Sequence, residues 1–347
     1  MDNTMLNRFY EDNVKMTRNE TSQNVEFVKP LVHGILQYVH ERDKRFQIQP
    51  LNVGSYYSNL KVSRADEFDY SVVLDAGSSF SWTPEHRLIM DSMEIMKWLK
   101  HQFHCRQHQL GNALLKFQEV KRRFKALVSE AVNRPQIRQY VDAKRLSESP
   151  ATTLTISHPN IVGDTISVDL APLIKSHAPF KPEFGWPRSG ARWPSWAKIE
   201  EIKAEGIHEV AKDPFYWSLS FVMCEKKLVD GIDLNGTCRK KSQRIIKKLR
   251  EMWCPKGTKQ ELTSYHLKNI LFWECENHPY DAEWTNEHIS VRIVSMCYLL
   301  IQHIQRGNLP LYFHTGVNLL ENKDRDVLGQ VVQNIFRFLK NPEHYLT

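Results

Sequence analysis

Residues 51–69 read LNVGSYYSNLKVSRADEFD, and this stretch decides the fold of the chain. Its apolar start runs into Gly54-Ser55, and Glu67-Phe68-Asp69 opens a segment that alternates like a β-strand as far as Leu74. Residues two apart on a strand project from the same face, so Glu67 and Asp69 present neighbouring carboxylates while Phe68 turns into the core. A lone Gly-Ser or a lone Glu-x-Asp carries little information, so a third acidic residue is needed.

That residue is Asp169, which lies in the apolar strand sequence Ile166–Leu170. Burying unpaired carboxylates is costly, and oxygen ligands of this kind suit two Mg²⁺ or Mn²⁺ ions. Gly54 would let the backbone approach a phosphate, and the Ser55 hydroxyl could bind its oxygens. One ion would hold a triphosphate, and the other would lower the pKa of an attacking ribose hydroxyl, with Asp169 as ligand and proton acceptor. Glu67, Asp69 and Asp169 together predict a metal-dependent nucleotidyltransferase.

The remaining patterns predict an α+β fold with two lobes. A mixed-sheet nucleotidyltransferase lobe is expected over residues 1–232, and an all-helical lobe over residues 233–347. The expected elements are a long helix over 21–46 that Pro30 kinks or splits, helices from Pro84 to about Val132 with a break near Gly111, a hairpin of 152–157 with 165–170, and a strand over Trp217–Val222.

Composition narrows the setting. The chain has 347 residues and a formal net charge of +7, with a pI near 9.0, which favours a polyanionic partner without identifying one. The start of the chain is polar, no apolar run is long enough to cross a bilayer, and six cysteines are scattered without a disulfide pattern. These features predict a cytosolic protein that does not enter a membrane.

The run from Leu51 to Asp69 resembles the active-site segment of cyclic GMP–AMP synthase, and so do Ser149–Ser157 and Ile166–Leu170. Downstream, Leu219–Lys226 and Ser264–Lys268 are similar to later parts of the same family. The likeness extends over about residues 21–320. It identifies the chain as similar to the cyclic GMP–AMP synthase-like receptors of the male-abnormal (Mab) nucleotidyltransferase family, whose fold is polymerase-beta-like.

This resemblance implies a role for each matched position. Glu67, Asp69 and Asp169 match the catalytic metal ligands, with two Mg²⁺ or Mn²⁺ ions per site. Tyr265 would stack on a base and Lys247 would lie near phosphate. The nucleotide-binding positions that it implies are Gly54, Ser55, Lys212, Ser218, Ser220, Glu225, Lys247, Ser264, Tyr265 and Lys268.

Two departures from the family pattern limit the transfer. The vertebrate enzyme carries a zinc-binding thumb before the helix that bears Lys247, whereas Asp230–Arg239 is short and holds only Cys238. No structural zinc is therefore expected, and relatives without the thumb favour double-stranded RNA over DNA. Ser218 stands where an acceptor-pocket arginine is expected, so the bases of the product stay open.

Basic residues supply a candidate nucleic-acid surface. Lys44 and Arg45 follow the first long helix, and Lys121, Arg122 and Arg123 lie on a later one. Duplex RNA is recognised through phosphates, shape and 2′-hydroxyls, which suits such a surface, although a single lysine is more often just solvated. Duplex binding is expected to shift the first helix and order residues 55–66, completing the metal site.

The resemblance thus implies an antiviral sensor that converts ATP, GTP or other nucleoside triphosphates into a cyclic dinucleotide. That product would act on a downstream receptor of the STING type, and the enzyme could form a ligand-dependent dimer. Two alternatives remain open. One is a catalytically inactive Mab-family interaction or developmental protein, against which the complete acid triad argues. The other is a nucleotidyltransferase that makes linear products.

Overall fold

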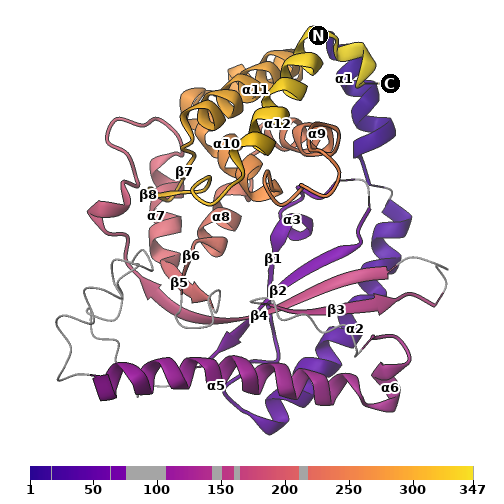
Figure 1. The fold of residues 1–347 in the computed structure, drawn as a ribbon, viewed down its shortest axis with the longest axis vertical. Coiled ribbons are helices and arrows are strands. Elements are labelled where there is room, and N and C mark those ends of the chain that lie inside the picture. The colour runs from indigo at the N-terminus through magenta and orange to yellow at the C-terminus, as the bar shows by residue number, and fades with distance from the viewer. Residues whose placement is uncertain are drawn as a thin grey trace.

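The computed structural model describes residues 1–16, 18–62, 64–75, 107–142, 151–159, 165–210 and 218–346. A mixed α/β lobe built on a curled sheet is followed by a helical lobe that sits over one side of the sheet (Figure 1). The predicted α+β class is confirmed. Both ends of the chain lie at the helical lobe (Figure 1).

The sheet of the first lobe is mixed in direction. Its strands are β1 (Leu51–Val53), β2 (Glu67–Leu74), β3 (Thr152–Ser157), β4 (Thr165–Ala178), β5 (Ile207–Val210) and β6 (Ser218–Ser220). The order is β1-β2-β4-β5-β6, and β3 pairs with the first half of β4. Strand β2 runs parallel to β4, whereas every other pairing is antiparallel. The predicted strand over 67–74 and the predicted 152–157/165–170 hairpin are confirmed, and the predicted strand over 217–222 is shorter, because Val222 already begins a helix.

Two long helices cover one face of this sheet: α2 (Arg18–Arg42) and α5 (Gln107–Val132), which a short α6 (Pro135–Arg138) follows (Figure 1). The split predicted at Pro30 is wrong, since α2 continues through it. Buried Val28, Val32, Ile35 and Leu36 anchor α2 to the core on both sides of the proline, so packing outweighs the lost backbone hydrogen bond.

The break predicted near Gly111 is also wrong. Helix α5 passes through this glycine without interruption, because one glycine costs a long helix only about 1 kcal/mol. The predicted helices before Gln107 lie outside the described residues.

The helical lobe contains α9 (Arg239–Trp253), α10 (Ser264–Asn277), α11 (Ile289–Arg306) and α12 (Arg325–Lys340). Its apolar core also takes in the N-terminal α1 (Asn3–Phe9) and the π-helical turn after it, Tyr10–Val14. An all-helical second lobe is not quite right, since β7 (Pro310–Leu311) and β8 (His314–Asn318) form a small hairpin.

A third core, rich in aromatic rings, joins the two lobes through α7 (Trp196–Glu205) and α8 (Val222–Val229). In its centre the Phe221 and Phe313 rings stack, with centroids 5.7 Å apart. The remaining short helices are α3 (Gly54–Tyr57) and the 3₁₀ turns Pro182–Phe184, Asp281–Trp284, Asn286–His288 and Pro342–His344.

Candidate active site

Three carboxylates meet on the face of the sheet that is not covered by α2 and α5. In the parallel pairing of β2 with β4, Asp69 is the direct partner of Asp169, and Glu67 is the partner of Ser167. Side chains alternate along each strand, and buried Phe68 and Val168 point to the opposite face. Glu67, Asp69 and Asp169 therefore project from the same face, on two adjacent strands.

This arrangement is electrostatically unfavourable without a cation. Burial, and then the neighbouring charges of Glu67 and Asp169, raise the pKa of Asp69 to about 6, although Lys61 and Lys268 act in the opposite direction. Among the described residues, Asp169 Oδ1 is buried and has no hydrogen-bond partner. A buried oxygen without a donor and a carboxyl that resists ionisation are what a hard divalent cation would relieve. The donor set fits Mg²⁺ or Mn²⁺.

Gly54 lies directly against this cluster. Strand β1 pairs with β2 so that Val53 faces Asp69, and Gly54 follows with a φ of +79°. A Cβ atom added to Gly54 would lie 1.8 Å from Asp69 Oδ2, so any other residue would displace the carboxylate. From Gly54 the chain forms a single helical turn, α3, and the Ser55 carbonyl accepts a hydrogen bond from the Leu60 amide at 2.8 Å. The glycine is needed for both its backbone angle and its lack of a side chain.

Lys61 is a site residue that the sequence interpretation left without a role. Its Nζ donates to Glu67 Oε2 at 2.7 Å and lies 3.0 Å from Asp66 Oδ1. Burial favours the neutral amine, but the hydrogen bonds and charges of Glu67 and Asp66 outweigh it, so the pKa of Lys61 is raised. The Lys61 ammonium thus pairs with Glu67, the exposed carboxylate of the triad. In the sequence, only the spacing of six residues between Lys61 and Glu67 could have indicated this ion pair.

Lys247 reaches the cluster from the helical lobe. It lies on α9, and its Nζ donates to the Leu60 carbonyl at 3.3 Å. Burial, and then the charge of Lys61, lower the pKa of Lys247 to about 8, whereas Glu67 and Asp69 raise it. A bound anion beside this buried amine would favour its charged form. The position near phosphate that the resemblance implies for Lys247 stays a prediction.

A second polar group joins α8 to α10 beside the triad. Tyr265 Oη donates to Glu225 Oε1 at 2.8 Å, and Lys268 Nζ makes an ion pair with Glu225 Oε2. Lys268 also lies 5.0 Å from the centroid of the Tyr265 ring. Since Lys268 acts on the pKa of Asp69, this group borders the carboxylates. The structure therefore brings Glu225, Tyr265 and Lys268 together as one network, which residue patterns could not reveal.

The other predicted positions are more scattered. Ser218 and Ser220 are half-buried on β6, where Ser218 pairs with Val210 and Ser220 with His208. Ser264 is half-buried and begins α10. Lys212 lies outside the described residues.

The predicted nucleic-acid residues lie on the far side of the sheet from the triad. Arg45 lies just after α2, and its Nη2 forms an ion pair with Asp43 Oδ2 at 2.7 Å. The hydrogen bond from Arg45 lowers the pKa of Asp43, and the charge of Arg123 on α5 lowers it further. Arg122 and Arg123 are exposed, Lys121 is half-buried, and Lys44 is exposed. These five residues thus belong to one region where the end of α2 adjoins α5 (Figure 1).

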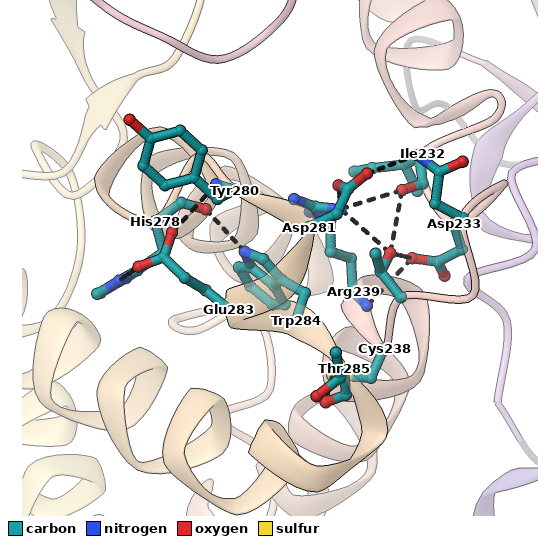
Figure 2. Close-up of polar contacts among 12 residues, drawn as sticks. Ile232, Asp233, Cys238, Arg239, His278, Tyr280, Asp281, Glu283, Trp284 and Thr285 are labelled. Carbon is teal, nitrogen blue, oxygen red and sulfur yellow. Dashed lines mark hydrogen bonds and ion pairs between the residues drawn. The ribbon is translucent and has the colours of Figure 1, made fainter.

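The segment before α9 is organised by Asp233 and Arg239 (Figure 2). Asp233 accepts hydrogen bonds from the backbone amides of Arg239 and Lys240 at 3.1 and 3.0 Å, which caps the helix. The buried Arg239 donates to Asp281 Oδ1 at 2.6 Å and lies 5.2 Å from the Trp284 ring. The Cys238 amide donates to the Trp284 carbonyl at 2.7 Å. Ionic and aromatic contacts therefore hold this short segment to the helical lobe.

The chain matches two family models in succession. The first, described as the Mab-21 protein nucleotidyltransferase domain, covers residues 56–231, just over half of the chain. The second, the Mab-21 protein HhH/H2TH-like domain, covers residues 238–337. The three carboxylates fall within the first match, and Lys247, Tyr265 and Lys268 fall within the second, so the candidate site is built from both.

Curated relatives agree with these matches. Protein mab-21-like 3 of Danio rerio is 35% identical over 184 residues, which are 52% of this chain and 46% of that protein. Protein mab-21-like of Drosophila melanogaster is 24% identical over 96% of this chain and 92% of its own length. Protein mab-21-like 3 of Xenopus laevis is 26% identical over 97% of this chain and 95% of its own length.

None of the helices in the described residues combines the length and the apolar character that crossing a bilayer requires. The order of the lobes, the mixed sheet and both family matches lead to the same assignment: the chain belongs to the Mab-21 family, with a nucleotidyltransferase domain followed by a helical C-terminal domain.

Proposed function

We propose that the chain is a metal-dependent nucleotidyltransferase of the cyclic GMP–AMP synthase-like receptor type. It joins two nucleoside triphosphates into a cyclic dinucleotide in the cytosol when double-stranded RNA binds. The observation that carries the proposal is the parallel register of Asp69 with Asp169, which brings them together with Glu67 on one face of the sheet. A sheet used only as a scaffold has no need for this concentration of negative charge, which costs stability.

Nucleotidyltransferases of this fold generally use Mg²⁺ or Mn²⁺. Glu67, Asp69 and Asp169 would hold the ions, since Asp169 Oδ1 lacks a donor among the described residues and the pKa of Asp69 is raised to about 6. When bound, such ions neutralise triphosphate charge and lower the pKa of the attacking hydroxyl.

The protein residues then have distinct tasks. Asp169 accepts the proton of the attacking ribose hydroxyl, the new O–P bond forms, and the bond to the leaving pyrophosphate breaks. Lys247 and Lys268 offset the charge of the triphosphate, and Gly54 allows a phosphate to approach the backbone. The hydrogen bond from Tyr265 to Glu225 fixes the tyrosine ring as a face on which a base can stack.

The described residues 58–62 and 64–66, which precede β2, offer a route from the RNA surface to this site. On one side, buried Asn24 of α2 donates to the Ala65 carbonyl at 3.0 Å, and on the other, Lys247 of α9 donates to the Leu60 carbonyl. A duplex bound along α2 and α5 would shift α2 and pull these residues through Asn24. Lys61 and Glu67 would then part, which frees the carboxylate for a metal ion.

A second candidate is an interaction protein without catalysis, and Lys61 is the observation that favours it. Its ammonium already pairs with Glu67 and Asp66, as a structural cation in place of a metal would. The three curated relatives described above are named as mab-21-like proteins.

The deciding experiment incubates the purified full chain with all four nucleoside triphosphates and Mg²⁺ or Mn²⁺. Duplex RNA, duplex DNA or no nucleic acid is added, and mass spectrometry identifies the products. The Glu67→Ala/Asp69→Ala double variant tests the site, and Glu321→Ala, which removes an exposed carboxylate on the helical lobe, is the matched control.

A cyclic dinucleotide made only with duplex RNA, by the wild type and Glu321→Ala but not by the double variant, supports the proposal. Linear oligonucleotides would overturn the cyclase assignment. If no product forms and Mn²⁺ does not bind to the wild type more tightly than to the double variant, the non-catalytic candidate is correct.

A further inference from the structure

A second group of metal-binding side chains lies where β4, α7 and β5 come together. His177 is near the end of β4, Glu205 is the last residue of α7, and His208 belongs to β5. Each offers one ligand atom, and the three atoms lie within 4.8 Å of one another. His208 Nε2 and Glu205 Oε1 are 3.0 Å apart, and the two imidazole rings meet edge to face at 5.1 Å. None of these residues takes part in the carboxylate cluster.

The backbone around this group is shaped to bring its members together. His177 adopts a φ of +46°, a left-handed conformation that is uncommon outside glycine. The β4–β5 pairing shifts register between Ile174 and Ala178, at the same place. Gly206 allows the two segments to touch, because a Cβ atom there would lie 2.7 Å from the His177 carbonyl carbon.

Neighbouring groups already orient the three side chains. His177 Nδ1 lies 2.8 Å from the Glu205 carbonyl, which can only accept, so Nδ1 carries the proton and the other ring nitrogen keeps its lone pair. Lys227 Nζ lies 3.5 Å from Glu205 Oε2 and leaves Oε1 to the histidine. Metal-binding histidines typically donate their second N–H to a backbone carbonyl, as His177 does, and metal-binding carboxylates are typically hydrogen-bonded, as Glu205 is to Lys227.

We propose that His177, Glu205 and His208 form a binding site for Zn²⁺, separate from the nucleotidyltransferase centre. Two imidazoles with one carboxylate are a donor set that zinc favours, whereas Mg²⁺ and Mn²⁺ favour oxygen ligands alone. Bonds of ~2.1 Å in a tetrahedron place the ligand atoms ~3.4 Å apart. The His208–Glu205 pair is already near that spacing, so only exposed His177 must move inward, and solvent would supply the fourth ligand.

Positive charges near the site oppose a cation, but the histidines are suited to bind one. Lys227 faces Glu205, and Lys175 acts on His208. Burial, which outweighs the raising effect of Glu205, lowers the pKa of His208. His208 is fully buried, and its Nδ1 has no hydrogen-bond partner among the described residues. Zinc at His208 Nε2 would take the place of the ring proton that is shared with Glu205, and this proton would move to Nδ1. The affinity for zinc would fall in acid.

Such a site would stiffen one edge of the sheet. It would tie the end of β4 to β5, where His208 pairs with Ser220 of β6. Bound zinc would thereby steady the strand that carries Ser218 and Ser220. Its binding does not require the catalytic proposal to be true.

The test uses the purified full chain, stripped with a chelator and dialysed into buffer that contains millimolar Mg²⁺ to occupy the carboxylate cluster. Zinc is then titrated against a chromogenic chelator, Tm is measured with and without zinc, and Co²⁺ is added separately to record the absorption of a tetrahedral site. The variants are His177→Ala and Glu205→Gln, with His33→Ala as the matched removal of an exposed histidine on α2. Asp69→Asn removes a ligand of the other site.

We expect about one zinc per chain for the wild type, His33→Ala and Asp69→Asn, with a rise in Tm of at least ~2 °C. His177→Ala and Glu205→Gln should lose at least ~10-fold in zinc affinity and the Co²⁺ absorption. Because His177 is exposed, its replacement should leave the fold intact, which circular dichroism checks. Equal zinc affinity in His177→Ala and the wild type, or loss of zinc in Asp69→Asn alone, would overturn the proposal.

Discussion

The two faces of the sheet are made by alternate residues of the same strands, yet their side chains meet opposite conditions. On β2, Phe68 and Tyr70 are 0% and 3% exposed and pack beneath α2 and α5. Asp69 lies between these two residues and Glu67 lies beside them, and both face the helical lobe. There Glu67 pairs with Lys61, whereas burial and neighbouring carboxylates raise the pKa of Asp69. The face beneath α2 and α5 is fully packed, and the other face carries the carboxylates that a metal ion would stabilise. Substitutions should therefore reduce stability on the first face and activity on the second.

The largest effect is expected for Asp69→Asn. The amide cannot replace a carboxylate that holds a divalent ion, so nucleotidyl transfer should fall by at least ~10⁴-fold, or ~5.4 kcal/mol in the barrier. Stability without metal should stay equal or increase, because a buried, repelled charge is removed. Radiolabelled product formation and urea unfolding measure the two effects. A large loss of stability would show that the carboxylate is structural.

Phe68→Ala tests the opposite face of the same strand. The ring is fully buried and packs against Tyr56 at 4.8 Å between centroids, so its loss should cost ~3–5 kcal/mol of unfolding free energy. Phe336→Ala, at a ring that is 44% exposed on α12, should cost less than ~1 kcal/mol. Urea titrations of both variants give the comparison. Similar losses at the two positions would contradict the assignment of the core face.

The raised pKa of Asp69 predicts a pH dependence with a definite sign. Since its pKa rises from 3.8 to about 6 on folding, the native chain binds the proton more tightly than the unfolded chain. Stability should therefore fall by at most ~3 kcal/mol as pH increases from about 4 to about 6, and level off above that range. The difference between wild type and Asp69→Asn isolates this contribution from other titrating groups. Added Mn²⁺ should restore stability above pH 6 and have little effect near pH 4.

Local patterns were enough to predict each strand of the site but not how the strands meet. Alternation placed Glu67 and Asp69 on one face, and apolar neighbours placed Asp169 on a strand, as the structure has them. The parallel Asp69–Asp169 register joins segments about 100 residues apart and depends on the crossover between them. No period in the sequence encodes that register. The resemblance implied only that Glu67, Asp69 and Asp169 bind the same metal ions, and the register itself comes from the structure.

The errors at Pro30 and Gly111 share a cause. Both were local signals of helix breaking. Burial on both sides of Pro30 outweighs the first, and the second costs a long helix only about 1 kcal/mol. The contacts that sequence reasoning missed, those of Lys61 and of Glu225 with Tyr265 and Lys268, depend on side chains from different elements. Their residue types alone suggest only solvated charge.

The smallest expected effect, at Lys61→Met, separates the two candidate functions most directly. The lysine side chain is 10% exposed and its ammonium neutralises Glu67, so methionine keeps much of the packing while freeing the carboxylate. If the ammonium competes with a metal ion, Lys61→Met should bind Mn²⁺ about 10-fold more tightly, or ~1.4 kcal/mol, and need less duplex RNA for activity. Calorimetric titration with Mn²⁺ measures the affinity, and Lys198→Met, whose ammonium pairs with exposed Glu201 on α7, is the matched control. Unchanged Mn²⁺ affinity together with lower stability would mean that Lys61 is a permanent structural cation, and the carboxylate face of the sheet would then be a charged scaffold and not a reaction centre.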